Sequence, residues 1–199
     1  MSSILLPSSP GIRSAKPRLL DWGGRLVPIL GGETQTLLRL GTRWSFEFVM
    51  PPLRTEPVGR NWVAKLAQAK LDGAIMPFIQ DGFDVGAPGA VTVNGDGQSG
   101  SLLAVKGATA VYPFRPGQFF SLIHGGRRYL HMVTAQVIAD DAGLATLPLL
   151  PMLRVIPDDG DVVDMVPKIE GSLIGQDFPW DVLTTPHIDV GTVRIDEDA

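Results

Sequence analysis

The residues of this chain that are able to do chemistry are few. It contains no cysteine, which excludes a thiolate zinc site and a disulfide framework. Its histidines are His124, His131 and His187. A Gly-Gly turn directly after His124 pairs His131 with Phe120, so the rings of His124 and His131 are predicted roughly 13 Å apart at ~3.3 Å per residue. Such a distance prevents them from sharing a metal ion, and all three histidines are interpreted as surface or structural residues.

Residues 95–100 read Gly-Asp-Gly-Gln-Ser-Gly and match the spacing G-x-G-x-x-G. A dinucleotide site needs a strand before this motif and a helix after it, because the helix N-terminus holds the pyrophosphate. Residues 101–107 have instead the pattern of a strand. Ser99 is also not centred in the G-x-S-x-G of a hydrolase elbow. We therefore expect a turn that binds no cofactor.

Four aspartates crowd one short segment, namely Asp158, Asp159, Asp161 and Asp164. They lack the regular ligand spacing and the closing glutamate of a calcium-binding EF-hand loop, so they are interpreted as a solvated acidic turn. No nucleophile, base and orienting group stand together elsewhere in the sequence. The sequence therefore predicts no catalytic, cofactor-binding or metal-binding residue, and no enzyme.

The composition indicates a folded chain rich in strands. Of 199 residues, 44% are hydrophobic and 19% are charged, which favours a packed core over disorder. The 23 glycines and 17 prolines favour many short strands and turns. No apolar run reaches the length of a membrane span, and the first twenty residues lack the pattern of a signal peptide, so no membrane insertion is expected.

Charge is distributed unevenly along the chain. Residues 1–72 hold ten Lys and Arg against five Asp and Glu, whereas residues 155–199 hold two against eleven. A basic N-terminal part is able to contact nucleic acid, but its charges are scattered singly and without interleaved aromatic residues. Opposite charge at the two ends also favours head-to-tail pairing between copies, which suits a ring.

The first third of the chain reads as strand, strand, helix, strand. Residues 1–25 are expected to form an extended arm with little regular structure, residues 26–30 a short strand, and Gly31 and Gly32 a turn. Residues 36–40 and 43–50 are expected to form a hairpin across Gly41 and Thr42. A helix is predicted over 59–71 and a strand over 74–79. The apolar side chains expected on one side of the helix are Trp62, Val63, Leu66, Ala67 and Leu71. In residues 43–50, aromatic side chains alternate with polar ones, which indicates a core face or, as a second interpretation, a subunit interface.

The rest of the chain reads as short strands separated by turns. They are expected at 102–106, 118–123, 127–134, 136–139, 144–149 and 161–166, which is typical of a small barrel or sandwich. In residues 187–196 the alternation slips at Gly191 and Thr192, and a β-bulge there would put Ile188, Val190, Val193 and Ile195 on one face. We expect this last strand to return to the first sheet, which makes residues 85–171 an insertion.

One passage resembles a phrase common in distal tail and minor tail proteins of siphovirus-type tailed bacteriophages. The resemblance covers about residues 40 to 170 and is weak over the first 30. Its matching pieces are Asp96-Gly97-Gln98-Ser99-Gly100, Gly117-Gln118-Phe119-Phe120-Ser121, Arg128-Tyr129-Leu130, Ala139-Asp140, Gly143, Ala145-Thr146-Leu147 and Pro151-Met152-Leu153-Arg154. The strand at 44–50, followed by Pro-Pro-Leu and a helix with Trp62, is also similar.

The resemblance implies a mainly β fold: a tail-tube-like β-sandwich with one flanking helix, formed by residues 1–84 and 172–199, and a small β-barrel inserted at 85–171. It further implies a structural virion protein, assembled in the host cytoplasm, that forms a homohexameric ring at the distal end of the tail. Such a ring joins the tail tube protein to the baseplate hub or other minor tail proteins. Genomic DNA passes through its lumen.

Two other classes of function stay open at this point. One is a module that binds a host receptor or a carbohydrate, with the inserted barrel as the binding part. The other is an enzyme such as a hydrolase, for which the sequence supplies no nucleophile and base in reach of each other.

Overall fold

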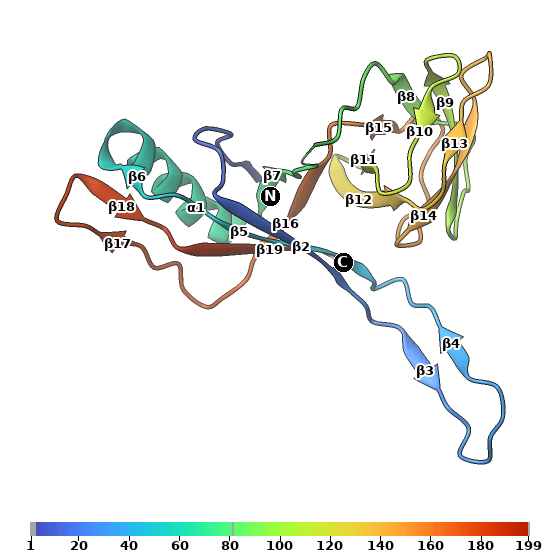
Figure 1. The fold of residues 1–199 in the computed structure, drawn as a ribbon, viewed down its shortest axis with the longest axis horizontal. Helices are drawn as coiled ribbons and strands as arrows, with labels where there is room; N and C mark the ends of the chain where they lie inside the picture. The colour runs from blue at the N-terminus through green and yellow to red at the C-terminus, as the bar shows by residue number, and fades with distance from the viewer. Residues whose placement is uncertain (1–2, 81, 199) are drawn as a thin grey trace.

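The computed structural model describes residues 3–80 and 82–198. A six-stranded sheet with one helix against it occupies one end of the molecule, and a closed β-barrel occupies the other (Figure 1). A long hairpin projects away from both of them. The predicted fold class is confirmed, because the chain is mainly β with a single α-helix in the described part and a closed six-stranded barrel.

The main sheet joins segments from both ends of the chain. Its strands, in spatial order, are β1 (Ile4–Leu5), β7 (Ala74–Pro77), β16 (Lys168–Leu173), β19 (Thr192–Glu197), β5 (Arg43–Val49) and β2 (Ser14–Leu20). β1 runs parallel to β7, and the other neighbours are antiparallel. Residue Ile195 of β19 lies opposite Phe46 of β5, so the last strand returns to the first sheet as predicted.

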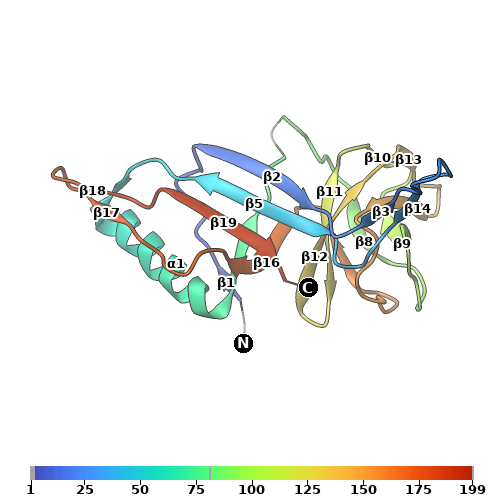
Figure 2. The same cartoon turned by 90° about the horizontal axis from the view of Figure 1, so that it is seen from below.

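Helix α1 (Arg60–Asp72) covers part of one face of this sheet (Figure 2) and follows the short π-helical turn η1 (Thr55–Gly59). It buries Trp62, Leu66 and Ala69, which recur every three or four residues and so form one stripe. Gly73, at φ +91°, ends the helix. The expected burial of Leu71 is wrong: its side chain is 83% exposed, because at 100° per residue it points away from Trp62.

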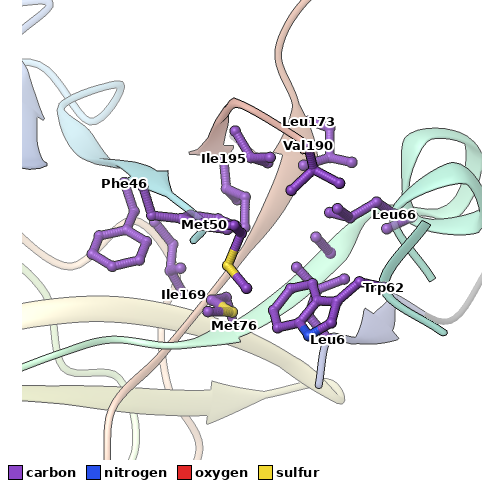
Figure 3. Packing of buried hydrophobic residues seen from close by; sticks show 14 of the residues in the cluster. Leu6, Phe46, Met50, Trp62, Leu66, Met76, Ile169, Leu173, Val190 and Ile195 are labelled. Carbon is purple, nitrogen blue, oxygen red and sulfur yellow. The ribbon is translucent and has the colours of Figure 1, made fainter. Parts of the chain in front are cut away.

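The core between the sheet and α1 is aromatic and aliphatic (Figure 3). The alternating side chains of β5 point into it, which confirms the first interpretation of that strand as a core face. Two barrel strands also contribute, since Leu130 is buried in the same cluster and Phe119 packs against it. The labelled members of the cluster are Leu6, Phe46, Met50, Trp62, Leu66, Met76, Ile169, Leu173, Val190 and Ile195.

The barrel has its own apolar core and closes in the order β11, β12, β14, β9, β8, β15. Its strands are β8 (Gly89–Val93), β9 (Leu102–Ala108), β11 (Phe119–His124), β12 (Arg127–Val133), β14 (Ala145–Leu150) and β15 (Val162–Asp164). Five of them coincide with predicted strands. The sequence did not predict β8, which lies in the glycine-rich segment after residue 81, nor β16 of the main sheet.

Three small sheets complete the fold. They are β3 (Gly24–Leu26) with β4 (Gln35–Leu37), β10 (Pro113–Phe114) with β13 (Val137–Ile138), and β17 (Asp181–Val182) with β18 (His187–Asp189) and β6 (Leu53–Arg54).

The predicted strands of the first 42 residues are wrong, although the turn expected at Gly31 and Gly32 lies at the observed tip. Residues 14–20 form β2, which pairs with β5 over its full length, and residues 35–37 pair with 24–26. Both pairings are centred near Gly31 and Gly32, so residues 14–49 are one long hairpin, and no turn joins two strands across Gly41 and Thr42. Residues 26–30 lead into its tip. The long-range partner of β2 satisfies backbone groups of a segment whose Pro- and Ser-rich composition suggested little structure.

The expected β-bulge near the C-terminus is also wrong, although its consequence holds. The strand is interrupted at Gly191, at φ +63°, and β18 and β19 on either side of it belong to different sheets. All four predicted side chains, namely Ile188, Val190, Val193 and Ile195, are nevertheless buried in one cluster. A positive φ is readily adopted by glycine, so Gly191 allows the chain to change direction between the two sheets.

Candidate functional site

The most exposed apolar feature of the structure is the tip of the long hairpin. We call residues 21–42 the projecting hairpin, because they extend beyond the main sheet (Figure 1). Ile29 and Leu30 at its tip are fully exposed, at 101% and 99%. Its exposed large apolar side chains are Trp22, Leu26, Val27, Ile29, Leu30, Leu37, Leu38 and Leu40. Exposed apolar side chains gathered on one element are typical of a surface that another molecule covers.

The base of the projecting hairpin is fixed by side-chain contacts. The Asp21 carboxylate accepts hydrogen bonds from the Gly23 amide, at 2.7 Å, and from the Thr42 hydroxyl, at 3.1 Å. The Arg43 guanidinium lies over the Trp22 ring, 5.7 Å from its centre. These contacts connect the two arms of the hairpin where it leaves the sheet. The apolar tip therefore extends from a base that is fixed to the sheet.

The face of the main sheet that points away from α1 is polar. Arg18 of β2 pairs with Glu47 of β5 at 2.9 Å, and Arg194 pairs with Asp196 within β19 at 2.7 Å. The Ser45 hydroxyl donates to the same Asp196 carboxylate. These side chains are polar and mostly half-buried, so this face of the sheet holds ion pairs and hydrogen bonds and is not a second apolar core.

The junction between sheet and barrel is built around a buried carboxylate. Glu197 at the end of β19 accepts hydrogen bonds from the amides of Trp44 in β5, at 2.8 Å, and Leu130 in β12, at 2.7 Å. Arg154 donates to it at 2.7 Å, and the two side chains are 1% and 5% exposed. Burial raises the pKa of Glu197, and the attraction of Arg154 opposes this rise.

Two further contacts tie the barrel to the sheet. Glu170 of β16 accepts hydrogen bonds from the Arg128 amide of β12, at 3.0 Å, and from the Ser3 hydroxyl, at 2.7 Å. The Ser121 hydroxyl of β11 donates to the Lys168 carbonyl and accepts from the Lys168 amide, both at 2.8 Å. The barrel and the sheet are therefore connected through several strands. The projecting hairpin extends from the sheet of this connected unit.

The three histidines lie in different environments. His131 is fully buried in the barrel wall, and its Nδ1 lies 2.9 Å from the Pro151 carbonyl. His187 lies in β18, opposite Arg54 of β6. His131 and Phe120 face each other across β11 and β12, as the predicted turn requires.

His124 meets two of the four crowded aspartates, a proximity that the sequence did not reveal. Its Nδ1 lies 2.7 Å from Asp161 and 3.9 Å from Asp158, so the three side chains are of the type and spacing that a divalent cation accepts. Asp161 also accepts the backbone amide of Asp158. The side chains of His124 and Asp161 therefore already bind each other, and this contact connects β11 to the acidic turn.

The predicted turn at 95–100 is confirmed and leads into strand β9. Gln98 holds it closed, since its side chain accepts from the Ala104 amide at 2.6 Å and donates to the Asn94 carbonyl at 2.9 Å. Asp159 accepts from the Gly95 amide and from Lys106, and the hydrogen bond from Lys106 holds the pKa of Asp159 below its ordinary value. These bonds give the glycine motif a structural role.

A groove of about 240 Å³ lies at the opposite end of the sheet from the projecting hairpin. It is bordered by residues 177–181, where the Phe178 and Trp180 rings lie 5.9 Å apart, and by Asp189 and Arg194. Lys70 of α1 donates to the carbonyls of Leu173 and Gly175 and so fastens the segment that forms one wall.

In the described residues, no helix is both long and apolar enough to span a membrane. The chain matches no protein-family model, and no curated protein matches it.

Proposed function

We propose that this chain is a structural subunit of a phage tail, which forms a homohexameric ring at the distal end and joins the tail tube to the baseplate hub. The observation that carries the proposal is the projecting hairpin, whose apolar tip is exposed although its base is anchored to a rigid sheet. Tail tube protein, and hub or other minor tail proteins, would be its neighbours, and DNA would pass through the lumen. The protein would be part of the virion after assembly in the host cytoplasm.

Covering the hairpin provides a driving force for association. Burying one large aliphatic side chain contributes about 1.5–3 kcal/mol, and several such side chains are exposed on this one element. The same residues left in water would favour non-specific aggregation.

The resemblance of residues 40–170 to distal and minor tail proteins supports the ring and its place in the tail. The contacts described above support a structural role in a second way. The Nδ1 of His131 lies against the Pro151 carbonyl inside the barrel wall, and the Nδ1 of His124 is paired with Asp161, so both rings connect parts of the barrel.

A second candidate function is a module that binds a receptor or carbohydrate. It is favoured by one observation, the exposed Trp180 beside Phe178 at the edge of a groove that also presents Asp177 and Asp181. An aromatic face with carboxylates beside it suits a sugar ring. This groove lies on the sheet end of the molecule, whereas the sequence-based version of this hypothesis placed the binder in the barrel.

The test of the proposed function removes the apolar tip. The double variant Ile29→Ser, Leu30→Ser is compared with wild type by native mass spectrometry and sedimentation velocity. We expect wild type to form closed oligomers and the variant to be monomeric, with an unfolding free energy within about 0.5 kcal/mol of wild type because the tip is exposed.

The matched control is Ile156→Ser, which replaces an exposed isoleucine of the barrel and should assemble like wild type. A double variant that assembles normally, or a wild-type chain that stays monomeric at all concentrations, contradicts the proposal.

A further inference from the structure

Three side chains able to bind a metal ion meet where strands β11 and β15 of the barrel pair (Figure 1). Ile123 of β11 lies opposite Val162 of β15, and the same register places His124 opposite Asp161. The Nδ1 of His124 lies 2.7 Å from the Asp161 carboxylate and 3.9 Å from that of Asp158. One imidazole from a barrel strand and two carboxylates from a separate turn therefore face the same small space.

The turn that carries the two carboxylates is held in place by backbone hydrogen bonds. The Asp161 amide donates to the Asp158 carbonyl at 3.2 Å, and the Asp158 amide donates to the Asp161 carboxylate at 2.9 Å. On the side of β8, the Gly160 amide donates to the Val93 carbonyl, and the Val93 amide donates to the Asp161 carbonyl. The backbone thus fixes the spacing of the two acidic residues, so binding of an ion needs little further ordering.

Among the described residues, the two carboxylates form no ion pair with a lysine or arginine. Lys106 pairs instead with the neighbouring Asp159 at 2.6 Å. Arg127, which lies opposite His124 in the hairpin of β11 and β12, pairs with Asp198 at 3.1 Å. The ligand atoms of the cluster lie within 4.8 Å of one another, so its two carboxylates repel each other and a bound cation would offset this repulsion. The local charge therefore favours a cation independently of the types of ligand.

The combination of nitrogen and oxygen ligands suits Zn²⁺ or a similar transition-metal ion. Zinc binds imidazole nitrogen at about 2.0–2.1 Å and carboxylate oxygen at about 2.0–2.2 Å, whereas Ca²⁺ and Mg²⁺ take oxygen ligands. Two ligand atoms at these distances in a tetrahedral site lie about 3.4 Å apart. The two separations from the His124 Nδ1, 2.7 Å and 3.9 Å, lie on either side of this value. Side-chain shifts of less than about 1 Å would complete the geometry.

We propose that His124, Asp158 and Asp161 bind one divalent transition-metal ion, with Zn²⁺ as the best fit and water at the fourth position. The inference goes beyond the proposed function and does not depend on it, because all three ligands belong to one copy of the chain. The ion would connect β11 to the turn that leads into β15, a strand of three residues that pairs with β8 through the single pair of Val162 and Thr92. Its role would be to strengthen the closure of the barrel.

The proposal departs from the sequence-based interpretation of this segment as a solvated acidic turn. The four aspartates by themselves lack the ligand spacing of a calcium loop, and His124 lies 37 positions before Asp161. Only the pairing of β11 with β15 brings the imidazole to the turn.

Calorimetric titration of the untagged chain with Zn²⁺ tests the site, and thermal unfolding gives a second measurement. We expect one ion per chain and a rise in Tm of roughly 5–10 °C at a hundredfold excess of free zinc over its Kd, because the ion binds the folded chain. His124→Gln and Asp161→Asn should each weaken binding by more than the roughly 10–100-fold that loss of a residue orienting a ligand costs. Asp158→Asn should also weaken binding, and it should fold like wild type because its side chain is 78% exposed.

The matched control is Asp159→Asn, which removes a carboxylate from the same turn. Asp159 pairs with Lys106 and lies outside the set of proposed ligands, so this variant should bind zinc like wild type. His187→Gln, in β18, controls for non-specific binding to a histidine. Nuclear magnetic resonance of the imidazole nitrogens should show a zinc-dependent shift for His124 and none for His187.

Three results would overturn the proposal. They are the absence of stoichiometric zinc binding, zinc binding that survives His124→Gln, and an equal loss of binding in Asp158→Asn and Asp159→Asn. The last result would mean that the turn attracts cations only through its net charge. None of these results bears on ring assembly, which is measured separately through the tip of the projecting hairpin.

Discussion

At the scale of single residues, His131 shows how burial controls an ionisable group. Its Nδ1 faces the Pro151 carbonyl, which can only accept, so this nitrogen carries the proton. Its Nε2 is buried and has no partner among the described residues. Burial lowers the pKa of His131 to about 4, because a charged ring in this position would lose its hydration.

This geometry predicts acid sensitivity. The unfolded chain binds a proton at His131 below about pH 6.5, whereas the folded chain binds it only near pH 4, so stability falls as the pH falls through this window. The whole difference corresponds to about 3 kcal/mol at 1.36 kcal/mol per pKa unit. Urea unfolding of wild type and His131→Phe at pH 7 and pH 4.5 measures it. We expect the variant to be less stable at pH 7, because the Pro151 carbonyl loses its donor, and to lose less stability on acidification. Parallel profiles would show that another group causes the loss.

The sequence identified His131 as structural but not its partner. The pairing with Phe120 follows from a local turn, whereas Pro151 reaches His131 from twenty positions away. The meeting of His124 with Asp161 is likewise produced by the closure of the barrel between β11 and β15. Local spacing contains no record of such contacts.

At the scale of elements, the contact between Glu197 and Arg154 couples the barrel to the sheet. It joins the end of β19 to β5, β12 and the segment after β14 in one buried set of hydrogen bonds. Removal of one partner leaves a buried charge uncompensated, which typically costs 3–5 kcal/mol. The pair is therefore expected to hold the two parts in one cooperative unit.

A double-mutant cycle tests this coupling. Glu197→Ala and Arg154→Ala should each cost about 3–5 kcal/mol, and the double variant should cost clearly less than their sum. Tryptophan emission reports on the sheet through Trp44 and Trp62, and tyrosine emission reports on the barrel through Tyr112 and Tyr129. The two signals should change together in wild type and separate in the single variants.

The more exposed pair of Arg18 and Glu47 is the matched control, and its cycle should give less than about 1 kcal/mol. Additive costs for the buried pair, or coincident transitions in all variants, would contradict the coupling.

Elements with a strong local pattern were predicted well, and elements defined by distant partners were not. The alternation in β5, the stripe of α1 and the hairpin of β11 and β12 each depend on residues that are only a few positions apart in the sequence. Strand β2 is largely exposed, and its order comes from pairing with β5. Strand β16 lies between β7, which precedes the barrel in the sequence, and β19, which follows it.

At the scale of the whole molecule, the structure separates the apolar tip of the projecting hairpin from an aromatic, acidic segment at residues 174–189. The uneven charge along the sequence favoured head-to-tail packing of copies, but the projecting hairpin itself holds two basic and two acidic residues. The sequence did not show that the N-terminal part contains a hairpin with an exposed tip, because the apolar run 26–30 also fits a buried strand. Exposure depends on where the tip lies relative to the core, and only the three-dimensional arrangement supplies that information.

Electron microscopy of the purified protein, or of the particle that contains it, tests the central claim most directly. We predict a closed ring with six-fold symmetry in which density for the projecting hairpin joins neighbouring copies. A well-behaved monomer that hydrolyses a glycan or a peptide would contradict the account.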